Sequence, residues 1–149
     1  MGGMETQFFQ NVLDAGAIIA GFCGIFLVFR IQREADYYRN PSCGSKDEQH
    51  FTSAFLLIIL ATLIVSVFGV VFPLFYLSGV RGCWLTPRLV VAGLLAALIL
   101  LAGYFVDELY HYQILKKFGK EEWKRELPIV VFSIVLCILA ALAWLVLTT

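Results

Sequence analysis

The chain has 149 residues, of which 60 % are hydrophobic and 15 % are charged, and its formal net charge is +0. An average soluble domain is about half apolar and a quarter charged. The composition and a mean hydropathy of +0.85 therefore exclude an ordinary soluble globular protein. Because the segments between the apolar runs are short, they leave no room for a separate soluble catalytic or sensor domain. We expect residues 1–149 to form a single integral membrane domain.

Four apolar runs reach or approach the roughly 20 residues that a helix needs to cross a bilayer core of ~30 Å. They cover residues 11–29, 51–77, 89–106 and 127–147. This pattern predicts an all-α membrane protein with the fold of a four-helix transmembrane bundle. Helix breakers follow the first and third runs only after further residues, so helices one and three should extend into the cytosol.

Individual residues predict where the helices begin and bend. Helix one should begin near Asn11 and stop before Asn40-Pro41. Pro73 should bend helix two, because proline lacks the amide of the backbone hydrogen bond. Thr86-Pro87 has the order of a helix cap followed by a first-turn proline. Leu127-Pro128 should begin helix four.

The basic residues predict the orientation in the membrane. Four Lys and Arg lie within residues 30–50 and five within residues 116–125, but only two within residues 79–88. Short loops rich in Lys and Arg stay in the cytosol. We therefore expect an integral protein of the plasma or inner membrane with both termini extracytoplasmic. Cys83 is the only cysteine expected outside, which leaves open a disulfide between two copies.

Small residues form a broad stripe along helix one. Helices in lipid associate through close packing at such residues. The stripe therefore predicts a helix-packing seam, either within the bundle or between subunits of an oligomer. Its members are Gly16, Ala17, Ala20, Gly21 and Gly24.

Three polar side chains inside the apolar runs are candidates for a pore or ion path. Asp14 would lie only about 5 Å inside a helix that begins at Asn11, where the helix dipole favours a carboxylate. An acidic ring at a pore mouth or a proton-accepting site is the alternative for Asp14. Thr62 and Ser66 share one face of helix two, where they would line a polar path or bond to carbonyls of their own helix.

A charged cluster is expected at the cytosolic rim of helices one and three, and salt bridges across the rim are its simplest interpretation. Its members are Arg30, Arg33, Glu34, Asp107, Glu108 and His111. Glu108 and His111 also have the E-x-x-H spacing found in metal-binding bundles. A metal or substrate site that includes Glu34 and Asp36 is thus the alternative.

A second basic group precedes helix four. It either serves only to orient the chain in the membrane or also binds anionic lipid headgroups. Its members are Lys116, Lys117, Lys120, Lys124 and Arg125. The lipid bilayer is the expected partner, together with further copies or other membrane subunits, and nucleic acid is not. No nucleotide-binding or hydrolase motif occurs, so we expect no catalytic residue, metal or cofactor.

These observations favour a non-enzymatic protein that acts through assembly, as a homo-oligomer or as a subunit of a larger membrane complex. An ion channel or transporter whose path is lined by helix one or helix two is the alternative. A metal-dependent membrane enzyme built on the cytosolic rim is a more distant alternative.

Overall fold

The computed structural model describes residues 2–39, 54–80, 86–113 and 123–147. In this part of the chain, four helices are long and apolar enough to cross a membrane. Their spans are Gly3–Gln32, Phe55–Leu77, Pro87–Leu109 and Leu127–Leu147. The prediction of an all-α, four-helix membrane fold is confirmed. The protein is therefore a small polytopic membrane protein.

The first helix, α1 (Gly2–Arg39), is longer at its N-terminus than expected. It begins at Gly2 and not near Asn11, although it ends before Asn40-Pro41 as predicted. Tertiary contacts hold the additional turns in place. Phe9 is fully buried and stacks on Tyr76 with ring centroids 3.9 Å apart, and the Tyr76 hydroxyl donates to Glu5 Oε2 over 2.8 Å.

The second span consists of three consecutive segments, α2 (Ala54–Val65), the π-helix η2 (Ser66–Val71) and α3 (Phe72–Leu77). In an α-helix the amide of residue 73 would donate to the Gly69 carbonyl, but Pro73 has no N–H. The backbone widens before the proline, and the Phe72 amide donates to the Val67 carbonyl, five residues back. Pro73 thus disturbs the helix where the sequence predicted a bend.

The third and fourth spans are α4 (Pro87–Gln113) and α5 (Trp123–Leu147). Thr86 caps α4 as predicted, since the Leu89 amide donates to Thr86 Oγ1 over 3.3 Å. The predicted start of helix four was wrong. Pro128 lies inside α5, which begins at Trp123. A proline this near the start of a helix removes a hydrogen bond only in the first turns.

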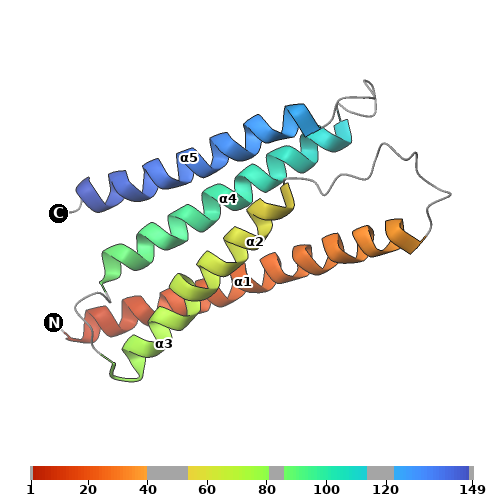
Figure 1. The fold of residues 1–149 in the computed structure, drawn as a ribbon. Helices are drawn as coiled ribbons and strands as arrows, with labels where there is room; N and C mark the ends of the chain where they lie inside the picture. Colours follow the sequence, from red (N-terminus) through yellow and green to blue (C-terminus); the bar gives the residue numbers. More distant parts are fainter. Residues whose placement is uncertain (1, 40–53, 81–85, 114–122, 148–149) are drawn as a thin grey trace.

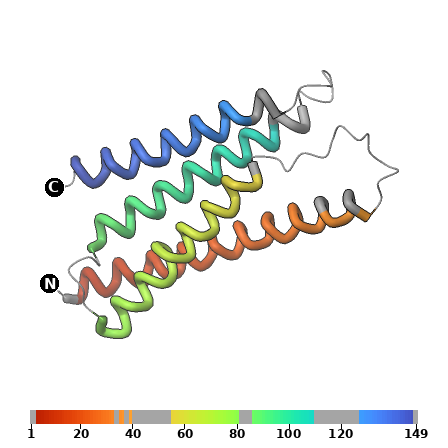
Figure 2. The backbone as a smooth tube through the Cα atoms, in the orientation of Figure 1, coloured from red at the N-terminus to blue at the C-terminus, as the bar shows by residue number. Residues whose placement is uncertain are grey.

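The helices are arranged with α2 and α4 in the middle and with α1 and α5 on opposite sides (Figure 1). The smooth trace shows the same order (Figure 2). The start of α1 and the end of α5 lie at one end of the molecule. In an apolar stretch of 18 residues from each helix, only 17 % of the residues of α1 or of α5 are buried inside the protein, against 44 % for α4. The rest of the described chain therefore covers less of the outer helices than of α4.

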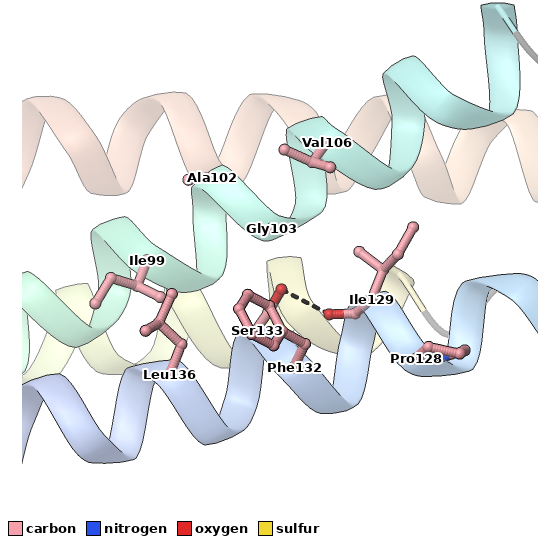
Figure 3. A pocket seen from close by; sticks show the side chains of 9 residues that line it. All are labelled: Ile99, Ala102, Gly103, Val106, Pro128, Ile129, Phe132, Ser133 and Leu136. Atoms are coloured by element: carbon pink, nitrogen blue, oxygen red, sulfur yellow. Dashed lines mark hydrogen bonds between the residues drawn. The ribbon is translucent and has the colours of Figure 1, made fainter.

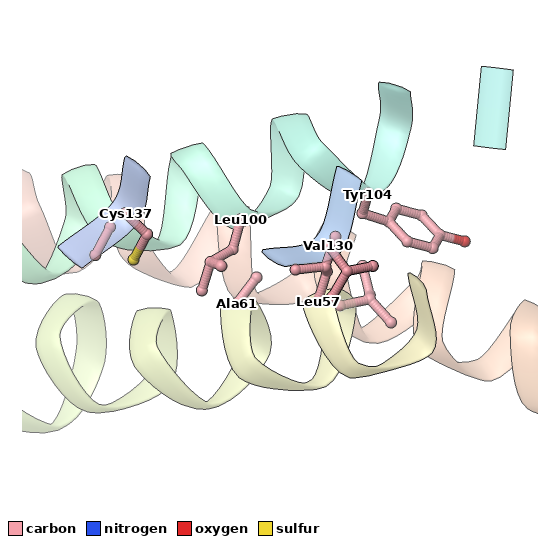
Figure 4. Packing of buried hydrophobic residues seen from close by; sticks show 8 residues of the cluster. Leu57, Ala61, Leu100, Tyr104, Val130 and Cys137 are labelled. Atoms are coloured by element: carbon pink, nitrogen blue, oxygen red, sulfur yellow. The ribbon is translucent and has the colours of Figure 1, made fainter. Parts of the chain in front are cut away.

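The main core lies where α2, α4 and α5 meet (Figure 4). Its centre consists of Leu57 and Ala61 from α2, Leu100 and Tyr104 from α4, and Val130 and Cys137 from α5. In lipid such contacts stabilise a fold through close packing, because hydrocarbon removes the hydrophobic driving force.

Cys83, for which the sequence left a disulfide between two copies open, lies outside the described residues.

Candidate functional site

The closest approach between α1 and the second span is at two glycines. A Cβ atom added to Gly16 would lie 2.6 Å from Gly69 Cα, and one added to Gly69 would lie 2.9 Å from Gly16 Cα. No side chain separates the two backbones at this point. A similar contact joins α4 to the second span, where a Cβ on Gly93 would lie 2.6 Å from Phe68 Cβ. Both contacts belong to seams inside one chain.

The small-residue stripe of α1 is divided between two sides of the helix. Gly16 is buried, and Ala20 packs at the edge of a core cluster that includes Cys23. Ala17 and Gly21 are exposed, and nothing lies within 4 Å of a Cβ added to Gly21. Gly24 is half-buried but equally open at its Cβ position. One side of the stripe therefore forms an internal seam, and the other has no neighbour within the described chain.

Asp14 lies on the exposed side of α1, within the apolar span Gly3–Gln32. It follows Glu5, which contacts Tyr76 at one end of the spans, by nine residues, or about 14 Å of helix. It precedes Arg30 by sixteen residues, or about 24 Å. Because α1 begins at Gly2, Asp14 is not in a first turn. The stabilisation by the helix N-terminus that its sequence position suggested is therefore absent.

Asp14 and the open part of the stripe share one side of α1, which we call the outer lane. The outer lane comprises Asp14, Ala17, Gly21 and Gly24. Successive members are three or four residues apart, so they follow each other along one face of the helix. Larger exposed side chains lie along one side of the lane, among them Ile18 and Ile25. The lane is thus a strip of small residues beside a carboxylate on the exposed side of α1.

Thr62 and Ser66 are half-buried and lie on a different surface from Asp14. Thr62 Oγ1 donates to the Ile58 carbonyl over 2.6 Å, and Ser66 Oγ donates to the Thr62 carbonyl over 2.7 Å. These bonds within the helix satisfy the hydroxyls locally, as the simpler interpretation of the sequence expected. Cys23 is buried and faces α2. Asp14 lies two and a half helical turns before Cys23 and therefore points to the opposite side of α1. The three residues do not line one path within a single chain.

An ion pair connects α1 to α4 at the other end of the spans. Arg30 Nη1 lies 2.6 Å from Glu108 Oε1, and the two side chains are only 5 % and 16 % exposed. Asp107, the preceding residue, is almost completely buried. The structure thus contains a salt bridge of the kind expected across this rim. Such a bond fixes the relative height of the two helices, because either partner alone would be a buried charge.

Most of the other charged side chains proposed from the sequence lie outside the described part of the structure. The structure describes the backbone but not the side chains of Arg33, Glu34, His111, Lys124 and Arg125. It does not describe Lys116, Lys117 and Lys120. Asp36 is exposed on the last turns of α1. Among the described residues, no group of three or more His, Cys, Asp and Glu is placed to bind a metal.

Some residues with important contacts were not recognised from the sequence as partners. The role of Gly69 in the crossing with Gly16 was not predicted. Gly103 was not considered, yet a Cβ there would lie 2.7 Å from Ser133 Cβ on α5. An isolated glycine in the middle of a long apolar helix is the signal for both, since it marks a close approach of another segment.

Comparison with known proteins adds no identification. No protein-family model matches the chain, and no curated protein or solved structure is significantly similar to it.

Proposed function

We propose that this protein acts through assembly in the membrane, as a homo-oligomer or as a subunit of a larger membrane complex, and not as an enzyme. The observation that carries the proposal is the position of Asp14, within an apolar span and on the exposed side of α1. The other members of the outer lane support it, because they leave the backbone beside Asp14 uncovered. The partner helix would pack against this lane.

The energetic argument concerns the carboxylate. Insertion scales assign an acidic residue at the centre of a membrane helix a cost of roughly 2.5–3.5 kcal/mol, which is an upper bound for Asp14 because it lies closer to Glu5 than to Arg30. Ionisable residues within membrane spans almost always face a protein interior or a water-filled cavity. A helix packed on the outer lane would remove the Asp14 side chain from lipid. Ala17 and Gly21 would allow that helix to approach closely enough for van der Waals and polar contacts.

Filling the outer lane tests the assembly. Gly21→Leu and Ala17→Leu should each weaken association by roughly 5-fold to 150-fold, since overfilling a close contact costs ~1–3 kcal/mol. Energy transfer between donor-labelled and acceptor-labelled copies in bilayers measures homo-oligomers. The size of the protein extracted gently from its native membrane measures a larger complex.

Ala15→Leu is the matched control, because Ala15 is also exposed on α1 but lies away from the lane. It should leave both energy transfer and particle size unchanged. If both lane variants behave like this control in both measurements, the outer lane is not an assembly surface and the proposal fails.

The orientation belongs to the same proposal, with both termini outside and the protein in the plasma or inner membrane. The sequence supports it through the uneven distribution of Lys and Arg. The fold is consistent with it, because the N-terminus of α1 and the C-terminus of α5 lie at the same end (Figure 1).

Labelling of single cysteines in intact cells tests the orientation. Gln7→Cys in α1 should react with a membrane-impermeant maleimide added from outside, whereas Asp36→Cys should react only after the cells are opened. Both positions are exposed in the structure, and all native cysteines are first replaced. The opposite pattern of labelling would reverse the proposed orientation.

A further inference from the structure

A cleft of about 440 Å³ lies between α4 and α5 on the outside of the molecule (Figure 3). Ile99 and Val106 of α4 and Phe132 and Leu136 of α5 form its walls. Its volume is in the range of ~300–1,000 Å³ that is usual for small-molecule sites. It is separate from the outer lane, because α1 and α5 lie on opposite sides of the protein.

The cleft exists because small residues alternate with large ones along the contact between the two helices. Gly103 packs directly against Ser133, so the helices touch at this level. Ala102, beside this contact, has only a methyl group, while Phe132 next to Ser133 is 66 % exposed. The large side chains therefore stand around a space that neither helix fills.

The lining of the cleft selects for an apolar ligand. Among the lining residues, only Ser133 has a side-chain hydroxyl, and its Oγ already donates a hydrogen bond to the Ile129 carbonyl over 2.8 Å. The other lining residues have no polar side chain. Each belongs to a membrane-spanning segment, so the medium around the cleft is hydrocarbon. The part of a ligand inside the cleft is then an alkyl chain.

The basic residues near one end of the cleft indicate the chemistry of the ligand's headgroup. Pro128 lies at the end of the cleft near the start of α5, and that helix begins with Trp123, Lys124 and Arg125. In the sequence, these two basic residues follow a further three within residues 116–120. Basic residues next to a membrane attract anionic lipid headgroups.

We propose that the cleft between α4 and α5 binds one acyl chain of an anionic phospholipid, whose phosphate lies at the level of Lys124 and Arg125. The apolar walls hold the chain, and the basic start of α5 selects the headgroup. This inference concerns a different surface from the proposed assembly and does not depend on it.

Lipid retention tests the proposal with the full-length chain. The protein is reconstituted into bilayers of phosphatidylcholine mixed with an equal amount of phosphatidylglycerol, extracted in mild detergent, and analysed by native mass spectrometry. We expect one phosphatidylglycerol to be retained per chain, with a preference of roughly tenfold over phosphatidylcholine. Equal retention of the two lipids, or no retained lipid, would overturn the proposal.

Two kinds of variant separate the chain from the headgroup. Ala102→Phe fills the cleft and should abolish retention of both lipids, whereas Ala143→Phe, the same change at an exposed position of α5 outside the cleft, should not. The double variant Lys124→Gln/Arg125→Gln should retain lipid but lose the preference. Retention by Ala102→Phe equal to that of the wild type would show that the lipid binds elsewhere.

A second filling variant protects the test against misfolding. Val106 lines the cleft and is 55 % exposed, so Val106→Trp should fold and should also displace the lipid. Circular dichroism confirms that each variant keeps its helices. A wild-type protein that is dimeric and lipid-free, and becomes monomeric in these variants, would assign the cleft to a second copy and overturn the lipid proposal.

Discussion

Gly16→Ala should destabilise the fold by up to about 2 kcal/mol, because an overpacking cost of about 1–3 kcal/mol exceeds the gain from alanine as the better helix former. A Cβ at this position would lie 2.6 Å from Gly69 Cα, and the contact is with backbone that cannot rotate away. The intrinsic gain from replacing glycine by alanine in a helix is only ~0.8–1.0 kcal/mol. The steric cost therefore outweighs the propensity, and α1 must move away from the second span.

Gly21→Ala is the matched control on the same helix. Nothing lies within 4 Å of a Cβ at Gly21, so this change should be neutral or stabilising by up to about 1 kcal/mol. The free energy of unfolding of both variants can be measured by denaturant titration in mixed micelles, at a protein concentration where the wild type is monomeric. Equal stabilities for the two variants would mean that α1 does not cross the second span at Gly16.

Removing one partner of the ion pair between α1 and α4 should have the largest effect on stability. Arg30→Met leaves the Glu108 carboxylate, only 16 % exposed, without the guanidinium that lies 2.6 Å away. Breaking a buried pair in this way costs roughly 3–5 kcal/mol. Glu108→Met should cost a similar amount, because it leaves the buried Arg30 without the same bond.

The double variant Arg30→Met/Glu108→Met distinguishes a specific pair from two separate charges. Replacing both members of a buried pair by apolar residues of similar size is often nearly neutral, so the double variant should be more stable than either single one. Arg88→Met, at an exposed position near the start of α4, should change the free energy of unfolding by no more than about 0.5 kcal/mol. Single effects that simply add in the double variant would contradict the coupling.

The spans and most of their ends were predictable from the sequence alone. Apolar segments of this length have few alternatives in a bilayer, because every backbone amide and carbonyl must be satisfied inside the segment. The predicted span at residues 127–147 coincides with that of the structure. The cap at Thr86 and the disturbance before Pro73 were also predictable, because capping and the missing proline amide are local properties of the chain.

The starts of helices one and four were predicted less well. The start near Asn11 was predicted from the length of the apolar run, residues 11–29, which is just enough to cross the hydrocarbon. Contacts of Phe9 and Glu5 with Tyr76, 67 and 71 residues away in the sequence, hold the turns before Asn11 in the helix. Such long-range contacts leave no trace in the local pattern, and they also changed the depth assigned to Asp14.

The sequence by itself determined that this chain crosses the membrane four times, because lipid imposes hydropathy and backbone bonding segment by segment. Only the tertiary structure decided which side of each helix faces its neighbours. Gly16 packs inside while Gly21 faces outward, although the two are alike in sequence. The physical reason is that a helix apolar on all sides carries no polar face to mark its exposed side, so shape complementarity with distant segments selects the packed one.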